Sequence, residues 1–268
     1  MMTSSRAQEP PLKAILQRYA HPEKFPPPPK NYPRVEDGSC CGDIIEESLH
    51  EDGHRAWGFV IYRCTYDSDS DWEAFMRRLL ADTEEDIYCD TGEKDLLNNL
   101  AITVFEDRDA FDGATAATVR EHFQKWAATA PQREQGTSYI QPPGHGFSSQ
   151  RYRYCLQVGR EELESVLRPD QLLSSLYFSF VRLVDTYWEP NVDPALDLEE
   201  EHQRLKAESG GNAWIYDTDD PVEGCRDWNV GWMRINFNGA MVDPYAALRE
   251  DYQWEVVYCR PPSVTSFG

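Results

Sequence analysis

The chain has little positive charge and few lysines. It carries 26 Lys and Arg against 47 Asp and Glu, for a formal net charge of -21, and arginine outnumbers lysine 20 to six. Phosphate backbones and anionic lipid surfaces repel such a chain, so we expect neither nucleic acid nor a membrane as a partner. Long apolar runs are also missing, since no stretch approaches the ~18 apolar residues of a membrane span. The first residues lack the apolar run of a secretory signal, and we expect a cytoplasmic location.

Cysteine pairs with the C-x-x-C spacing are missing as well. The seven cysteines are odd in number and include no C-x-x-C spacing. Cys64, Cys155 and Cys259 fall within apolar stretches, where a free thiol behaves as a small hydrophobic group. This pattern favours a reducing, intracellular setting.

The motifs of common cofactor and catalytic sites are absent. The chain has no G-x-S-x-G elbow, no Walker lysine motif and no three-glycine dinucleotide turn. His50 to His54 matches H-E-x-x-H in letters, but Asp52 and Gly53 form a turn signal that interrupts the helix which such a zinc motif needs. We therefore predict no metal and no cofactor, and assign no catalytic residue.

The first 35 residues differ in character from the rest of the chain. They hold six basic and two acidic residues, a balance of +4. A short amphipathic helix is predicted by the spacing of Leu12, Ile15, Leu16 and Tyr19. An extended polyproline segment is predicted at 26–29. We interpret residues 1–35 as a basic, proline-rich arm whose helix docks on a single domain, residues 36–268.

The domain alternates strand and helix patterns. Strands are predicted at 57–65, 100–105, 151–158, 176–184, 230–237 and 253–259. The alternation within 151–158 is typical of a half-buried strand, and residues 186–227 form an acidic insertion. The order predicts an α+β fold, a mixed sheet with helices on one face in a ferredoxin-like style, and leaves open two related β-α-β halves. A doubly wound parallel sheet is the alternative.

Four stretches carry a resemblance to a known family. They are WGFVIYRCTYDSDSDW (57–72), FEDRDAFDGATAATVREHF (105–123), VGWMRINF (230–237) and YCRPPSV (258–264). In these the chain resembles a large family of ascomycete proteins with no established activity, over roughly residues 55 to 264. Because no catalytic residue is assigned in that family, the resemblance implies fungal relatives and no particular chemistry.

Arginines recur within the predicted strands, where charged side chains are uncommon unless paired. In one interpretation they lie near sheet edges and pair with the abundant carboxylates. In the other, two of them line a pocket with three aromatic side chains and receive an anionic or polar organic ligand. The residues of that candidate pocket are Trp57, Tyr62, Arg63, Trp232 and Arg234.

Two classes of function fit these features. The first is a small-molecule binding protein, or an enzyme that needs no cofactor, in fungal metabolism including secondary metabolism. The alternative is a protein-interaction or regulatory module that uses the polyproline arm and the acidic segment. A concave pocket would favour the first class, and a flat body with a filled core would favour the second.

Overall fold

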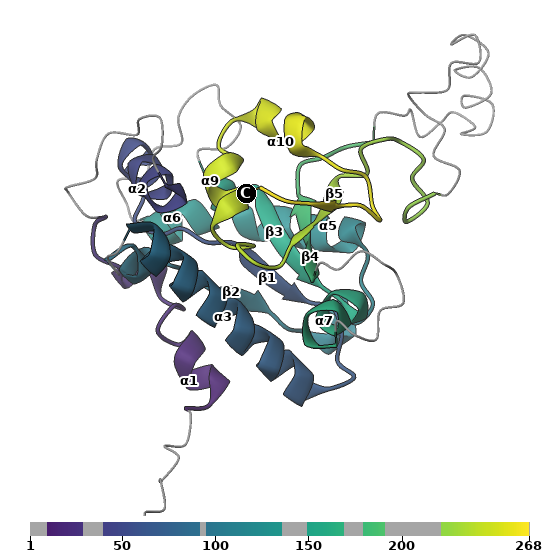
Figure 1. Ribbon diagram of the computed structural model, residues 1–268, viewed down its shortest axis with the longest axis horizontal. Coiled ribbons are helices and arrows are strands. Elements are labelled where there is room, and N and C mark those ends of the chain that lie inside the picture. The colour runs from purple at the N-terminus through teal and green to yellow at the C-terminus, as the bar shows by residue number, and fades with distance from the viewer. Residues whose placement is uncertain are drawn as a thin grey trace, which may run out of the picture.

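A mixed sheet of six strands lies at the centre of the described part of the chain (Figure 1). The computed structural model describes residues 10–28, 40–91, 95–135, 149–168, 179–190 and 221–267. The strand order is β2-β1-β3-β4-β5-β6, and the predicted α+β class with a mixed sheet is confirmed. The strands are β1 (Val60–Arg63), β2 (Thr103–Phe105), β3 (Tyr154–Val158), β4 (Phe180–Asp185), β5 (Trp232–Asn236) and β6 (Val264–Thr265).

Helices and short 3-10 turns connect these strands. The described helices are α1 (Leu12–Leu16), α2 (Cys41–Asp52), α3 (Asp69–Thr91), α4 (Arg108–Phe111), α5 (Ala116–Ala127), α6 (Ala130–Gln135), α7 (Arg160–Leu167), α9 (Asp243–Ala247) and α10 (Asp251–Val257). The 3-10 turns are η1 (Pro22–Lys24), η2 (Asp95–Asn99) and η3 (Gln150–Tyr152).

The first three strands form a parallel unit in which the strand order reverses. From β1 the chain passes through α3 to the edge strand β2, and it then returns past β1 through α5 to β3. β1 pairs in parallel with both neighbours, so that Val60 lies opposite Thr103 on one side and Cys155 on the other. α3 and α5 cover opposite faces of the sheet (Figure 1). This half is therefore doubly wound, with helices on both faces of parallel strands, which is the arrangement that the sequence analysis gave as its alternative fold.

The rest of the sheet is antiparallel at its centre and parallel at its far edge. β3 pairs antiparallel with β4 and β4 with β5, whereas β5 and β6 are parallel and are connected through α9 and α10. Because β1 and β2 are direct neighbours, the first unit is not the split β-α-β of a ferredoxin-like fold, and that detail is corrected. A β-α-β unit does lie at each edge, but the two differ in size.

Helices cover both faces of the sheet, not one as expected. One face packs under α2, α3, α7, α9 and α10 and includes Phe59, Ile61, Leu156, Leu183 and Met233. The other packs under α4 and α5 and includes Val60, Tyr62, Cys155, Val184 and Trp232. A right-handed return from β2 to β3 must cross the face opposite α3, which is why α5 lies there. For the same reason every residue of β3 is buried, and the half-buried strand expected at 151–158 is corrected.

The strand expected at 253–259 is a helix in the structure, α10. The backbone N–H of Glu250 donates to the Gln253 side chain at 2.6 Å, which satisfies a group at the helix start. Trp254 and Tyr258 are buried four residues apart, and Tyr252 and Val256 are exposed, as helical periodicity requires. Capping and packing outweigh the strand preference of the two valines at 256 and 257.

The N-terminal arm packs against the body along residues 10–28. Tyr19 is buried, its carbonyl accepts a bond from the Ile102 N–H at 3.1 Å, and its hydroxyl donates to Glu84 at 2.9 Å. The Asn99 side chain donates to the Pro26 carbonyl at 2.9 Å. The expected short helix, α1, lies against the larger core. Residues 1–9 and 29–35 of the arm, and 191–220 of the expected acidic insertion, lie outside the described residues.

Candidate functional site

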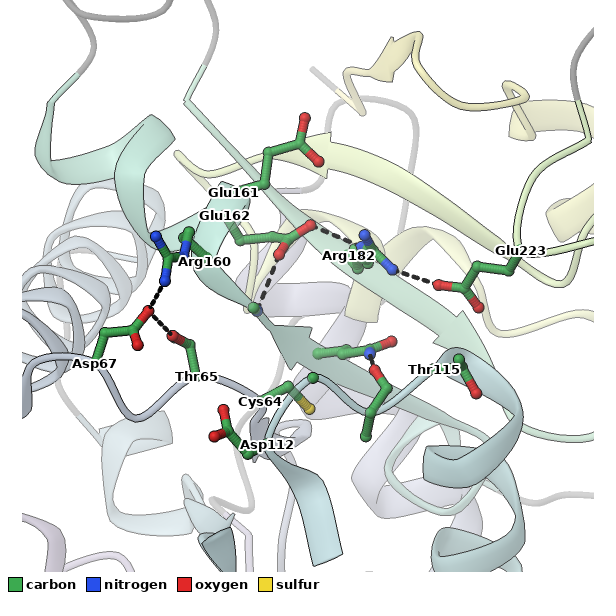
Figure 2. A pocket seen from close by; sticks show the side chains of 14 residues that line it. Cys64, Thr65, Asp67, Asp112, Thr115, Arg160, Glu161, Glu162, Arg182 and Glu223 are labelled. Atoms are coloured by element: carbon green, nitrogen blue, oxygen red, sulfur yellow. Dashed lines mark hydrogen bonds and ion pairs between the residues drawn. The ribbon is translucent and has the colours of Figure 1, made fainter.

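A pocket opens beside the carboxyl ends of β1 and β3, where the strand order reverses (Figure 2). Its volume of about 540 Å³ lies within the ~300–1,000 Å³ typical of small-molecule sites. Open α/β sheets bind ligands at this position, in the crevice outside the strand ends. The described lining comes from Cys64, Thr65 and Asp67 after β1, the loop 112–115, Gln157 and Arg182 on the sheet, residues 159–162 at the start of α7, and Glu223.

A polar row across the sheet forms part of this pocket. Tyr62, Gln157, Arg182 and Arg234 are paired in register across β1, β3, β4 and β5. Because paired residues point to the same face, all four side chains lie on the face that α5 covers. Gln157 and Arg182, at the centre of the row, line the pocket.

The loop between α4 and α5 forms one wall. Gly113 has a φ of +69°, which a glycine adopts without strain, and its N–H donates to the Cys64 carbonyl at 3.1 Å. The Gln157 amide nitrogen donates to the Ala114 carbonyl at 2.7 Å. Thr115 caps α5 by accepting from the Thr118 N–H at 3.4 Å. Hydrogen bonds thus tie the wall to the segment after β1 and to β3.

The start of α7 forms the opposite wall. The buried Glu162 carboxylate accepts a bond from the Gly159 N–H at 2.9 Å, and so satisfies a free donor at the helix start. A Cβ at position 159 would come within 2.9 Å of that carboxylate oxygen, so a glycine suits the position. Glu162 also accepts from Arg182 Nε at 2.7 Å, which couples the helix start to β4.

Arg182 lies between two carboxylates and above an indole. Its Nε donates to Glu162 and its Nη1 to Glu223, both at 2.7 Å, and its guanidinium lies 4.2 Å from the Trp232 ring. Burial acts to lower the pKa of Arg182, but the two carboxylates act more strongly in the opposite direction and leave that pKa above its ordinary value. This side chain is permanently charged and already neutralised.

Glu223 reaches the pocket from a tight turn. Val222 and Cys225 exchange two backbone hydrogen bonds of 2.9 Å, and both central residues have positive φ, 48° at Glu223 and 83° at Gly224. This is the geometry of a type I′ turn, in which a glutamate is uncommon. The turn directs the Glu223 carboxylate to the Ala116 N–H at the start of α5, at 3.0 Å, as well as to Arg182.

The carboxylates at the rim each have an arginine beside them. Figure 2 shows Asp67 and Asp112 on the side of the pocket opposite Glu161 and Glu162. The rim pairs are Arg160 with Asp67, Arg108 with Asp112 at 3.8 Å, and Arg234 with Glu161 at 2.6 Å.

One buried acceptor in the lining has no partner among the described residues. Gln157 is 2 % exposed, and its side-chain oxygen accepts no hydrogen bond there. Its amide orientation is set by the donation to Ala114. Beside it, burial raises the pKa of the Cys64 thiol to about 12, although the Gln157 amide acts to lower it. Cys64 is therefore protonated at neutral pH and a poor nucleophile.

The two arginines of the sequence-predicted site do not meet. Two strands separate β1 from β5, and the strand register places Arg63 on the α3 face and Arg234 on the α5 face. Arg63 pairs with Asp69, and with Glu106 at 3.5 Å. Because both arginines pair with carboxylates and point to opposite faces, the expected cationic pocket between them is corrected.

The three aromatic residues of that predicted site are buried in the two cores. The Trp57 indole donates to the Leu96 carbonyl at 2.9 Å. Tyr62 forms a 2.9 Å hydrogen bond with His122 Nδ1, and Trp232 packs under Arg182. None of the three lines the pocket described above. None of the five predicted residues lines the pocket, but three contact residues that do: Arg63 donates to the Thr65 carbonyl at 3.0 Å, Arg234 pairs with Glu161, and Trp232 packs under Arg182.

The pocket residues that the sequence reasoning missed carried weak signals. The run VGREE at 158–162 places a glycine three residues before a glutamate at the end of an apolar strand, which is a helix-start pattern. Gln157 and Glu223 carried no such signal. Their part in the site depends on the pairing of β3 with β4 and on the turn at 222–225.

The histidine pair at 50 and 54 does not form a zinc site of the H-E-x-x-H kind. α2 ends at Asp52, and Gly53 caps it with a φ of +66°, so the two histidines do not share a helix. Within the ranges that the structure describes, no group of three or more His, Cys, Asp or Glu side chains could hold a metal ion.

Comparison with protein-family models, curated proteins and solved structures finds no match for this chain. In the described part of the chain, no helix combines the length and apolar character needed to cross a bilayer.

Proposed function

We propose that the protein binds a small polar organic molecule in the pocket beside β1 and β3. The position of the pocket carries this proposal, because the carboxyl ends of parallel strands at a reversal of strand order are the usual ligand site of such sheets. The lining supports it, since it is polar and comes from segments that hydrogen bonds hold in place. Preorganised walls reduce the entropic cost of binding.

With the resemblance to the ascomycete family, we extend the proposal to a role in fungal metabolism, including secondary metabolism. The cysteines support a reducing cytoplasmic setting, because those at 64, 155, 225 and 259 are free. Reversible binding is favoured over nucleophilic catalysis, since burial raises the pKa of the Cys64 thiol in the described lining.

The proposal is tested with a panel of small cationic, neutral and anionic polar compounds. A compound that binds the folded state should raise the melting temperature progressively as its concentration exceeds Kd, because the stabilisation grows as RT ln(1 + c/Kd), where c is its free concentration. Hydrogen–deuterium exchange of the complex should then show protection at the amides of 64–67, 112–116 and 159–162, which surround the pocket. The exposed face of α10 is the control and should exchange unchanged. Stabilisation with protection confined to other segments, or no stabilisation by any class, would contradict the proposal.

A further inference from the structure

The pocket's hydrogen-bond donors are largely engaged by the protein itself. Arg182 uses Nε and Nη1 on Glu162 and Glu223. Arg160 donates to Asp67, and the Gln157 amide nitrogen donates to a backbone carbonyl. An anionic ligand would have to displace one of these carboxylates, and would gain only the difference between two similar ion pairs.

The acceptors are in excess. The buried Gln157 oxygen has no partner in the described part of the chain, and an unsatisfied buried acceptor destabilises the folded state unless a ligand or water donates to it. Asp112 is half exposed and its ion pair with Arg108 is long, at 3.8 Å. Glu161 bonds Arg234 through one carboxylate oxygen. These unused acceptors favour a ligand that supplies hydrogen-bond donors.

The charge of the lining points to the same class. Five carboxylates and two guanidinium groups line the pocket, a formal charge of -3, and Arg108 and Arg234, which pair with two of these carboxylates from outside the lining, reduce it to -1. A concave wall of one sign concentrates ions of the opposite sign. No aromatic side chain belongs to this described lining, so it is not the aromatic cage that receives quaternary ammonium groups.

We infer that the ligand is an aliphatic cation with N–H donors, a primary amine or polyamine, held by Asp112 and the Gln157 oxygen. This inference rests on the proposed function and narrows its ligand class. An ammonium supplies several donors to oxygen acceptors and no acceptor of its own, which matches the unused groups of the lining.

The test is calorimetric titration with α,ω-diaminoalkanes of three to eight carbons and spermidine, compared with the diols and dicarboxylates of the same lengths. We expect binding of at least one amine and of none of its matched diol or dicarboxylate. Asp112→Asn should weaken amine binding roughly ten- to a hundredfold, because a charge-assisted bond is lost at an exposed position that the fold tolerates.

Asp109→Asn is the matched control, with the same change of charge at an exposed residue of α4 outside the lining. It should leave amine affinity within about twofold. Equal losses in both variants would show general attraction to an acidic chain and overturn the inference. Binding of a diol or dicarboxylate, without any amine, would overturn the amine assignment while the proposed pocket stands. If no compound of any class binds, both proposals fail.

Discussion

Removal of the buried Arg151 side chain should cost more stability than any surface change. Arg151 is 0 % exposed and forms a bidentate pair with Glu134, Nε to Oε2 at 2.7 Å and Nη2 to Oε1 at 2.9 Å. Its remaining donors reach the carbonyls of Gly58 and Ala101 and the Thr103 hydroxyl at 2.8 to 2.9 Å. The side chain thus joins α6, β2 and the segment before β1.

The expected loss for Arg151→Met follows from what is left behind. Among the described residues, Glu134 would remain as a buried carboxylate that accepts a side-chain hydrogen bond from the Tyr152 hydroxyl, at 2.9 Å. Breaking a buried pair on one side costs about 3–5 kcal/mol, because the remaining charge is desolvated and uncompensated. Against a typical total stability of about 5–15 kcal/mol, this loss is large.

A double-mutant cycle separates the ion pair from general packing. Glu134→Gln alone leaves the Arg151 charge uncompensated, whereas the double variant carries neither charge. We therefore expect the double variant to be more stable than the sum of the single losses implies, by about 2 kcal/mol.

Urea unfolding followed by tryptophan fluorescence measures each free energy, and Arg133→Met on the exposed side of α6 serves as the control, with a change within about 0.5 kcal/mol. Additive losses, or an Arg151→Met variant within about 1 kcal/mol of the parent, would refute the reasoning.

Three further outcomes are expected. Burial and then Arg249 lower the pKa of His54 to about 4, against the opposing effect of Glu134. As the pH falls, the unfolded state therefore binds a proton at this histidine before the folded state does. The free energy of unfolding should be unaffected by this group above about pH 6.5 and should fall by about 3 kcal/mol as the pH drops toward 4. The pH profile of His54→Leu should be flatter. Glu162→Gln should cost about 2 kcal/mol in urea, since Arg182 keeps only Glu223; a neutral result would contradict the ion-pair role. Tyr19→Ala should cost about 3 kcal/mol by releasing the arm from the body, and a loss under 1 kcal/mol would show that the arm is a separable appendage.

Local pattern alone determined much of the secondary structure. The apolar run at Val60–Arg63, the helix that follows it and the docking helix near Leu12 were all predicted. These features depend on near neighbours in the chain, through side-chain periodicity and helix-start residues, and so are visible in sequence. The α+β class followed from their order.

Patterns failed where two local preferences competed. At 251–257, valines and aromatic residues favoured a strand. The segment is a helix because this conformation buries Trp254 against Tyr154, in a stacked pair whose ring centroids are 5.4 Å apart. At 154–158, alternation indicated one buried face, but α5 covers the other. Both outcomes depend on which elements pack against the segment, which its own residues do not encode.

The pocket itself was decided by tertiary structure. Its lining comes from five segments between Cys64 and Glu223, brought together by the strand order and by the turn at 222–225. The predicted partners Arg63 and Arg234 looked equivalent in sequence, yet the register places them on opposite faces. A shift of one residue in pairing reverses the face of a side chain, so hydrogen bonding between distant strands, and not composition, selects which charges meet.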